Sequence, residues 1–210
     1  MIFELPKLYP ITDRRLSGLT HAEQVARLCE GGARLVQLRE KLLPARAFCA
    51  EVAEALKVAR AFGARLIVND RADVAMLVGA DGVHLGQDDM PPRAARLVLG
   101  GGKVVGFSTH GVEQAAAAAS LPVDYVAIGP VFDTSSKENP DPSVGLEGVR
   151  RVREAVGRAV KLVAIGGVTP ETAPSVLEAG ADSVAVIGAL VATPDPAEIT
   201  RRTRVFLAHL

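Results

Sequence analysis

The sequence predicts an α/β fold, a single (β/α)8 TIM barrel, and three observations support this prediction. The chain has 210 residues, of which 49% are hydrophobic, so it is long enough for one domain over residues 1–210 with a sizeable core. Short runs rich in Val, Ile and Leu recur along the chain, and segments with helical spacing of apolar residues separate them. The alternation repeats without a run of consecutive hairpins, which is typical of a barrel of parallel strands.

Eight segments have the composition of strands, and each ends in polar or glycine residues. In chain order they are residues 8–13, 35–40, 65–70, 81–86, 104–109, 124–131, 161–167 and 183–189. Parallel barrel strands are covered on both faces, so near-continuous apolar runs are expected in them. A doubly wound open sheet is the alternative, but that fold favours a GxGxxG turn after the first strand, which this sequence lacks.

Helices are predicted between the strands, with clear examples at residues 21–30, 44–61 and 114–119. Thr20 precedes the first of these helices as an N-cap, and Gly31 follows its last residue. The segment Thr169-Pro170-Glu171 should open a further helix, with proline in the first turn.

Charge and cysteine content exclude several classes of protein. A formal net charge of +0 and a pI near 6.9 argue against a nucleic-acid or membrane-surface partner. Cys29 and Cys49 are too few and too far apart for a disulfide framework, which favours a reducing compartment. We see neither a signal peptide nor an uncharged apolar stretch of about 20 residues. We therefore expect a cytoplasmic protein, and the sequence leaves a homo-oligomer open.

The carboxyl ends of the predicted strands turn polar where apolar residues are expected. A barrel places its active site at this end. The polar residues are Thr12 and Asp13, then Gln37, Arg39, Glu40 and Lys41, then Asn69, Asp70 and Arg71, then His84, Gln87 and Asp89, and finally Ser108 and His110. Each group taken alone is explained by a helix cap or a solvated loop, but five groups on one face indicate a site.

Asp70 and Asp89 follow the third and fourth predicted strands, which are neighbours in a barrel. Two carboxylates on adjacent strand ends can share a divalent cation, and ligation by oxygen alone suits Mg²⁺. The alternative is that Asp70 caps the helix beginning at Arg71 and that Asp89 opens the turn before Pro91.

Further residues at this end suit the binding of phosphate groups. Gln37, Arg39 and Lys41 alternate along the second strand and its exit, so they share one face and can bind a polyphosphate. The alternative is an exposed, charged strand end. Glycines end the last two strands, at Gly167 and Gly188, where backbone N–H groups can meet an anion, although plain tight turns also contain glycine.

Residues 133–145 form a long polar segment that suits either a lid with phosphate-binding hydroxyls or a solvated loop. His84 and His110 lie at strand ends, where a histidine acts either as a proton carrier or as a hydrogen-bonded structural residue. Both alternatives stay open at this point.

Together these motifs resemble the thiamine-phosphate synthase family. The matching segments run in family order from Leu8 to about Leu190, and they are Gln37-Leu38-Arg39-Glu40-Lys41, Val68-Asn69-Asp70-Arg71, Asp81-Gly82-Val83-His84-Leu85-Gly86-Gln87 with Asp89, Gly129-Pro130 with Thr134-Ser135-Ser136-Lys137, and Ala164-Ile165-Gly166-Gly167. The family couples 4-amino-2-methyl-5-(diphosphooxymethyl)pyrimidine to a thiazole phosphate, giving thiamine phosphate and pyrophosphate. The resemblance therefore implies a transferase of thiamine biosynthesis that acts on small molecules by a Mg-assisted dissociative substitution.

The resemblance also implies roles for single residues. The residues implied to bind the pyrimidine diphosphate are Gln37, Leu38, Arg39, Glu40, Lys41, Asn69, Ser108 and Lys137, of which Arg39, Lys41, Ser108 and Lys137 are implied to be catalytic. One Mg²⁺ per subunit would be bound by Asp70 and Asp89. The thiazole phosphate would be bound by Thr134, Ser135, Ser136, Gly167, Ile187 and Gly188. Ser136 stands where the family usually has Thr, and Gly188 stands where it often has Ser.

Two other functions are compatible with parts of these motifs. A thiazole tautomerase of the same superfamily moves a proton and needs neither diphosphate nor metal, and a non-catalytic paralogue would only bind phosphate ligands. Asp70, Asp89, Lys41 and Lys137 are all present, which argues against both alternatives.

Overall fold

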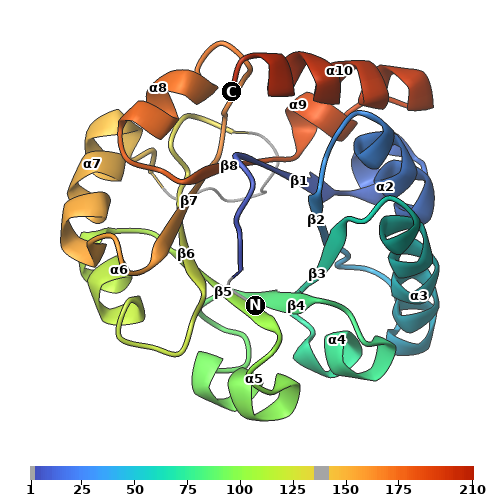
Figure 1. Cartoon of the computed structure of the whole chain (residues 1–210), viewed down its shortest axis with the longest axis horizontal. Coiled ribbons are helices and arrows are strands. Elements are labelled where there is room, and N and C mark those ends of the chain that lie inside the picture. The colour runs from blue at the N-terminus through green and yellow to red at the C-terminus, as the bar shows by residue number, and fades with distance from the viewer. Residues whose placement is uncertain (1–2, 135–141) are drawn as a thin grey trace.

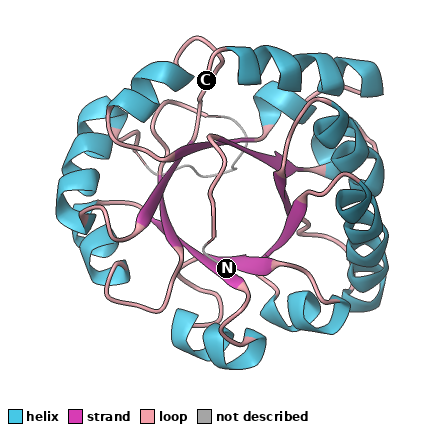
Figure 2. Cartoon of the chain, viewed as in Figure 1, coloured by secondary structure: helices cyan, strands magenta, loops and turns pink. Residues whose placement is uncertain are grey.

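Eight parallel strands close into a barrel in the order β1 to β8, and helices surround it (Figures 1 and 2). The structure is a computed structural model that describes residues 3–134 and 142–210. Its strands are β1 (Leu8–Thr12), β2 (Leu35–Leu38), β3 (Arg65–Asn69), β4 (Gly82–Leu85), β5 (Val104–Thr109), β6 (Tyr125–Ile128), β7 (Lys161–Ile165) and β8 (Ser183–Val186). The predicted (β/α)8 class is confirmed.

Seven of the eight strands are shorter than the sequence pattern predicted, and only β5 has its predicted bounds. The prediction was wrong at the strand ends because the residues there adopt backbone conformations that leave the sheet. After β3, Asp70 has a φ of 64°, and after β7, Gly166 has a φ of 102° and Gly167 a φ of 64°. These departures turn the polar strand ends out of the ladder and towards the barrel mouth.

The helices follow the predicted pattern, with shifted bounds at α6, predicted at residues 114–119, and at α8. They are α1 (Arg14–Ser17), α2 (His21–Glu30), α3 (Ala45–Ala61), α4 (Ala72–Val78), α5 (Pro92–Leu99), α6 (Val112–Ala118), α7 (Gly145–Val156), α8 (Ala173–Glu178), α9 (Gly188–Val191) and α10 (Pro196–Ala208). Thr20 caps α2 in a capping box with Glu23, as its position predicted. Helix α8 begins at Ala173 and not at Pro170, because the preceding residues form a turn in which the Thr169 N–H donates to the Thr172 hydroxyl at 2.9 Å.

The core has two layers because successive strand residues point to opposite faces. One layer lies between strands and helices and includes Leu28, Leu38 and Leu66. The other fills the barrel interior and includes Tyr9, Ile11, Leu35, Ile67, Val104, Tyr125 and Val163. A barrel interior filled in this way is a packed core and not a pore.

The segment before β1 crosses the barrel opening at the amino ends of the strands (dark blue in Figure 1). The ring of Phe3 lies 6.4 Å from that of Tyr125, and the guanidinium of Arg65, the first residue of β3, lies 5.5 Å above Phe3. Leu5 also packs against the interior layer. These residues close the amino end of the barrel beneath its interior core.

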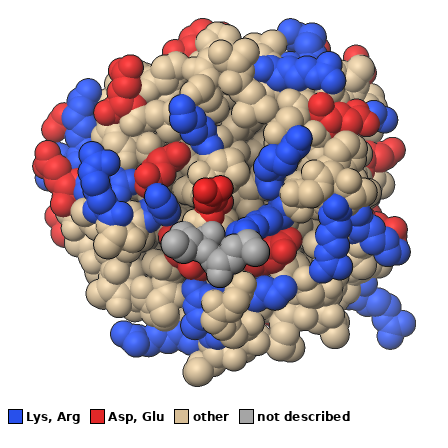
Figure 3. Space-filling model, in the orientation of Figure 1, with Lys and Arg blue, Asp and Glu red and all other residues tan. Residues whose placement is uncertain are grey.

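Charges of both signs are interspersed over the face shown in Figure 3, as the net charge of +0 leads one to expect. None of the described helices is long and apolar enough to cross a bilayer.

Candidate active site

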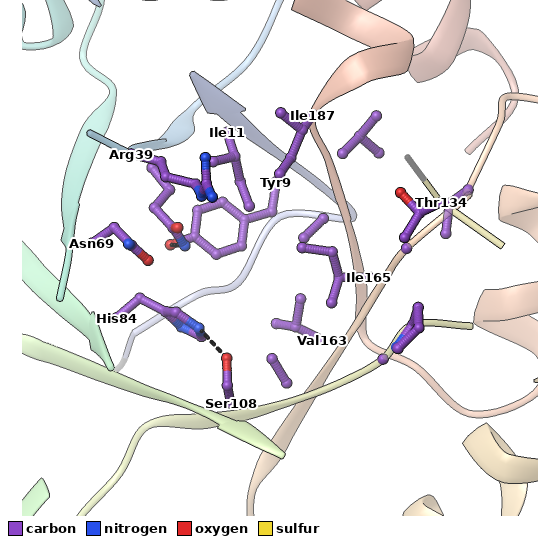
Figure 4. Close-up of a pocket in the computed structure, with 18 of the residues that line it drawn as sticks. Tyr9, Ile11, Arg39, Asn69, His84, Ser108, Thr134, Val163, Ile165 and Ile187 are labelled. Atoms are coloured by element: carbon purple, nitrogen blue, oxygen red, sulfur yellow. Dashed lines mark hydrogen bonds between the residues drawn. The ribbon is translucent and has the colours of Figure 1, made fainter. Parts of the chain in front are cut away.

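A cavity of about 690 Å³ lies at the carboxyl ends of the strands, where the polar strand ends were predicted to converge. Its two sides differ in chemistry, and Figure 4 shows Arg39, Asn69 and His84 on one side with Thr134 and Ile165 across from them. The side formed by β2 to β5 presents Gln37, Arg39, Lys41, Asn69, Asp70, His84, Asp89 and Ser108. The side formed by β6 to β8 presents Ala127, Gly129, Val163, Ile165, Gly166, Gly167, Ala185, Ile187 and Gly188.

Arg39 is oriented by Asp13, a residue that the sequence had marked only as a polar strand end. The Arg39 guanidinium donates to Asp13 Oδ2 at 2.6 Å, and the side chain of Asp13 is only 4% exposed. The other carboxylate oxygen of Asp13 accepts the backbone N–H of Arg15 at 2.9 Å and so caps α1. Asp13 therefore fixes the guanidinium at the cavity wall. Its position directly after β1, the neighbour of β2, was the signal for this role.

Glu40 and Leu38 keep their substrate-binding roles as predictions, and the structure shows what each side chain contacts in the free protein. The Glu40 carboxylate accepts the backbone N–H groups of Lys41 at 2.8 Å, Leu42 at 2.7 Å and Leu43 at 3.3 Å, and its other oxygen lies 3.4 Å from His21 Nε2. Burial works to raise the pKa of Glu40, but these hydrogen bonds outweigh it and hold the pKa below its ordinary value. Glu40 thus shapes the loop that carries Lys41.

The Leu38 side chain is fully buried in the layer between strands and helices, so only its backbone is left to meet a ligand.

Asp70 and Asp89 face each other at the cavity mouth. The left-handed backbone of Asp70 turns its carboxylate out of the β3 direction, and its N–H donates to the His84 carbonyl at 2.7 Å. Lys41 forms an ion pair with Asp70, and Asp89 Oδ2 accepts the N–H of Gly86 at 2.6 Å. Burial raises the pKa of Asp89, and the like charge of Asp70 raises it further. Helix α4 is capped at Arg71 without a side-chain bond, so the cap role weighed for Asp70 is wrong.

A chain of buried hydrogen bonds crosses the cavity floor. Gln37 Nε2 donates to the Tyr9 hydroxyl at 3.2 Å, and the Tyr9 and Tyr125 hydroxyls lie 3.0 Å apart. His84 Nδ1 lies 2.9 Å from the Tyr125 hydroxyl, and its Nε2 lies 2.8 Å from Ser108 Oγ (Figure 4). Full burial lowers the pKa of His84 to about 4, so the imidazole is neutral at pH 7. His84 is therefore the hydrogen-bonded residue that the structural alternative described.

Sequence reasoning missed Tyr9 and Tyr125, because a tyrosine in an apolar strand looks like ordinary core. Their hydroxyls nevertheless line the cavity floor. The available signal was the alternation of Tyr9 with Ile11 on the inward face of β1.

The opposite wall contains the glycines expected to bind phosphate. Gly167 has a φ of 64°, and a Cβ there would lie 2.5 Å from the Asp133 carbonyl oxygen, so this turn requires glycine. Thr134, Ile187 and Gly188 line the same side of the cavity. His110 sits at the rim, with Nδ1 3.2 Å from the Gly129 carbonyl. The predicted roles of Ser135, Ser136 and Lys137 fall outside the described residues.

The family model for thiamine monophosphate synthase matches residues 8–190 of this sequence. This chain belongs to the thiamine monophosphate synthase family. The match to that family runs from the first residue of β1 into α9, so it covers every strand of the barrel.

Individual relatives agree with the family match. The chain is 48% identical to a thiamine-phosphate synthase of Koribacter versatilis over 198 residues, with 91% of this chain and 92% of that protein covered. It is 41% identical to a thiamine-phosphate synthase of Chloroflexus aurantiacus, with 96% and 93% covered. Among solved structures, a thiamine phosphate pyrophosphorylase from Pyrococcus furiosus superposes with a TM-score of 0.84 at 36% identity, with 97% and 96% covered.

Proposed function

We propose that this chain joins 4-amino-2-methyl-5-(diphosphooxymethyl)pyrimidine to a thiazole phosphate, giving thiamine phosphate and pyrophosphate. The observation that carries the proposal is the asymmetry of one cavity. Two cations and a carboxylate pair lie on the side formed by β2 to β4, and glycine turns with apolar residues lie on the side formed by β7 and β8. Such a cavity suits two anionic substrates of different kinds, one with a diphosphate and one with a single phosphate.

The cationic side suits the diphosphate. Breaking the C–O bond of the pyrimidine substrate leaves its electron pair, and hence negative charge, on the diphosphate. Arg39, held in place by Asp13, and Lys41, held by the loop that Glu40 shapes, are fixed where they can neutralise this charge as it develops. The aminopyrimidine delocalises the positive charge left on its methylene carbon, so the reaction needs positioning and charge stabilisation more than an enzyme nucleophile. Lys137 remains a predicted third cation.

The carboxylate pair fits a divalent cation such as Mg²⁺. Asp70 and Asp89 offer oxygen ligands from adjacent strand ends. Burial and, after it, the like charge of Asp70 raise the pKa of Asp89, and a cation between the two carboxylates would relieve that repulsion. Among the residues that the structure describes, no cluster of three or more His, Cys, Asp or Glu residues could hold a metal ion. The remaining ligands would therefore come from substrate oxygens and water, as is usual for Mg²⁺, which would then supply positive charge to the diphosphate.

The opposite side suits the thiazole phosphate. Ile165, Ile187 and Val163 provide apolar surface for a ring, while the turn at Gly167 and the backbone at Gly188 lie beside it. In this arrangement the thiazole nitrogen lies across the cavity from Arg39 and can attack the pyrimidine methylene carbon, which forms the new C–N bond. Ser136 stays a predicted contact of the phosphate.

The deciding experiment measures pyrophosphate release with Mg²⁺ and each substrate alone or both together. We expect release only when both substrates are present, with one thiamine phosphate formed for each pyrophosphate. Pyrophosphate released at the same rate from the pyrimidine substrate alone would show a hydrolase and contradict the proposal. Isomerisation of a thiazole compound without diphosphate would show a tautomerase, and binding without product would show a non-catalytic paralogue.

A further inference from the structure

The hydrogen-bond chain on the cavity floor links five side chains from five strands. It runs from Gln37 on β2 through Tyr9 on β1, Tyr125 on β6 and His84 on β4 to Ser108 on β5. All five side chains line the cavity, and Gln37 and Ser108 were both predicted to bind substrate. Of the five residues, only Ser108, at the end of the chain, is part-exposed, while Gln37 at the other end is buried. The chain therefore connects a buried amide on one side of the barrel to a ligand-facing hydroxyl on the other.

Each inner member of this chain has one hydrogen to give. The two tyrosines are fully buried, and burial raises the pKa of both hydroxyls above the ordinary value, so both stay protonated. Each ring nitrogen of His84 lies beside one hydroxyl oxygen, so a hydrogen accepted at one nitrogen leaves the other nitrogen to carry the single N–H. Because every member has a single hydrogen, the direction of any one bond sets the direction of the next.

The direction is set at the Gln37 end. Gln37 Nε2 donates and cannot accept, so it uses the Tyr9 oxygen as its acceptor. Among the described residues, the one other hydrogen-bond partner of the Tyr9 hydroxyl is Tyr125, so Tyr9 donates to Tyr125. Tyr125 in turn donates to His84 Nδ1, which must carry no hydrogen. The imidazole hydrogen is therefore on Nε2 and is donated to Ser108 Oγ.

We propose that this chain frees the hydroxyl hydrogen of Ser108 for donation into the cavity, towards an acceptor atom of the pyrimidine diphosphate. Tyr9, Tyr125 and His84 are then positioning residues that act through Ser108. The reverse direction would turn the Ser108 hydrogen towards His84 and leave only an acceptor facing the ligand. The proposal rests on the proposed function for the identity of the ligand, but the direction of the chain is a property of the free protein.

The surrounding structure is built to hold this chain. Gly106 leaves room for the Tyr125 ring, since a Cβ at that position would lie 2.0 Å from Tyr125 Cζ. The rings of His84 and Tyr125 stack with centroids 5.6 Å apart, and Tyr9 meets Tyr125 edge-on at 5.9 Å. On the other side of Ser108, Gln87 donates to its backbone carbonyl. The hydroxyls are thus held in place by ring packing as well as by hydrogen bonds.

The first test reads the histidine tautomer in the substrate-free protein. In protein labelled with ¹⁵N at its four histidines, two-bond couplings between ring protons and nitrogens distinguish Nε2–H from Nδ1–H, and the His84→Gln variant identifies the His84 signals. We expect the Nε2–H form at about pH 7.5, and a share of the Nδ1–H form in Tyr125→Phe, where nothing donates to Nδ1. The Nδ1–H form in the unaltered protein would overturn the proposal. This result is independent of whether the protein is active with any substrate.

The second test is kinetic. Tyr125→Phe keeps the ring and removes the hydroxyl, and we expect it to lower kcat roughly tenfold, the effect of losing one oriented hydrogen bond. Tyr9→Phe should have a smaller effect, because Tyr125 can still donate to His84. Both effects should vanish in a Ser108→Ala background, since neither tyrosine acts except through that hydroxyl. Effects that multiply with Ser108→Ala would show an independent role and contradict the proposal.

A matched control separates this effect from the loss of any buried hydroxyl. Thr109 is the next residue on β5, is 1% exposed, and donates to the Ala127 carbonyl at 2.8 Å outside the hydrogen-bond chain. Thr109→Val should lower the thermal midpoint about as much as Tyr125→Phe and leave kcat unchanged. An equal fall in kcat for both variants would mean that Tyr125 matters only for folding, which would overturn the proposal.

Discussion

Asp70 combines two unfavourable features at one residue. It is the one non-glycine residue with a positive φ in the described part of the chain, and its carboxylate faces that of Asp89. Strain of this kind costs of order 1–3 kcal/mol and persists where the surrounding structure enforces it, commonly at functional sites. Asp70 is therefore kept at a cost in stability.

The substitution Asp70→Asn should separate stability from activity at this residue. Asn adopts the left-handed region readily and carries no charge, so we expect a thermal midpoint equal to or above that of the unaltered protein. Loss of one charge-stabilising carboxylate should lower turnover by roughly 100-fold or more. Asp73→Asn is the control, because Asp73 pairs with Arg71 on exposed helix surface and should leave turnover unchanged. A variant that loses stability and activity in proportion would contradict the assignment.

Metal binding by the carboxylate pair can be measured without catalysis. Mg²⁺ that binds the folded state stabilises it according to its concentration relative to Kd, so we expect the thermal midpoint to rise with added MgCl₂. The rise should be absent in Asp89→Asn and present in Asp73→Asn. An equal rise in all three proteins would indicate nonspecific binding, and full activity after EDTA treatment would exclude the metal altogether.

His84 predicts a sensitivity to acid with a definite sign. Its pKa falls from 6.5 to about 4 on folding because of burial, so between these values the unfolded chain binds a proton that the folded chain does not. The contribution of His84 to the free energy of unfolding is fully present above about pH 6.5 and is lost as the pH falls towards about 4. Between about pH 7.5 and about pH 5 the loss from His84 is about 2 kcal/mol.

Urea unfolding of the unaltered protein and of His84→Gln at both pH values isolates this contribution, because the lowered pKa of His21 acts in the same direction in both proteins. An unchanged pH dependence in His84→Gln would show that His84 is protonated in the folded protein.

Residue types and spacing predicted the charged part of the site better than its neutral floor. Arg39, Lys41, Asp70 and Asp89 were recognisable because charged residues are unexpected at the ends of buried strands. Tyr125 was not recognisable, because a tyrosine suits a strand with or without a partner for its hydroxyl. The pairing of Asp13 with Arg39 joins residues 26 positions apart, and it depends on the register that places Thr12 beside Leu38.

Among the elements, strands β4, β6 and β8 share one arrangement at their amino ends. Asp81, Asp124 and Asp182 each precede one of these strands, and each accepts a backbone N–H from the preceding strand at 2.7–2.8 Å. Arg96 on α5 and Arg153 on α7 donate to the second and third of these carboxylates, at 2.7 and 2.5 Å. Each arginine also donates to backbone carbonyls of the connections around it. Helix, loop and strand are thereby joined by one side chain.

Replacing Arg153 by lysine should show how much the several hydrogen bonds of its planar guanidinium contribute to stability. Lysine keeps the charge but cannot donate to Asp182 and to the carbonyls of Gly180 and Val160 together, so we expect a loss of about 2 kcal/mol in the free energy of unfolding. The KM for both substrates should not change, because the arrangement lies at the end of the barrel opposite the cavity. Arg150→Lys on the same helix, in an exposed pair, should change stability by less than about 0.5 kcal/mol. Equal losses in both variants would contradict this account.

Strand ends were the least predictable part of the elements. The pattern extended β2 through Glu40 and β7 through Gly167, but the ladder stops at Leu38 and Ile165. Composition alone could not show where these strands end, because the residues beyond the last ladder pair still line the barrel although their backbone no longer pairs with the neighbouring strand. The turns are imposed by tertiary partners, such as the three N–H groups that the Glu40 carboxylate collects.

For the whole molecule, the count and order of the elements were enough to predict the barrel. Eight strand-like segments separated by helices leave few topologies once crossover connections are right-handed and short. Closure itself comes from the pairing of β1 with β8, in which Tyr9 lies beside Ala185. No single segment contains the information for that contact. It follows from the number of strands and the twist of the sheet.

The Phe3 and Leu5 plug beneath Tyr125 has a kinetic consequence. Phe3 and Leu5 cover the amino end of the barrel beneath its interior core, so ligands enter and leave the cavity at the carboxyl ends of the strands. The ligand that binds deepest must therefore bind first and leave last. If the pyrimidine lies against Ser108, deeper in the cavity than the thiazole phosphate on the side formed by β6 to β8, then a thiazole phosphate that binds first blocks the entry of the pyrimidine diphosphate. Initial rates should then fall at high concentrations of thiazole phosphate and recover as the pyrimidine diphosphate is raised. A barrel that is closed at one end thus imposes ordered binding on two substrates, whereas a barrel open at both ends would allow either substrate to bind first.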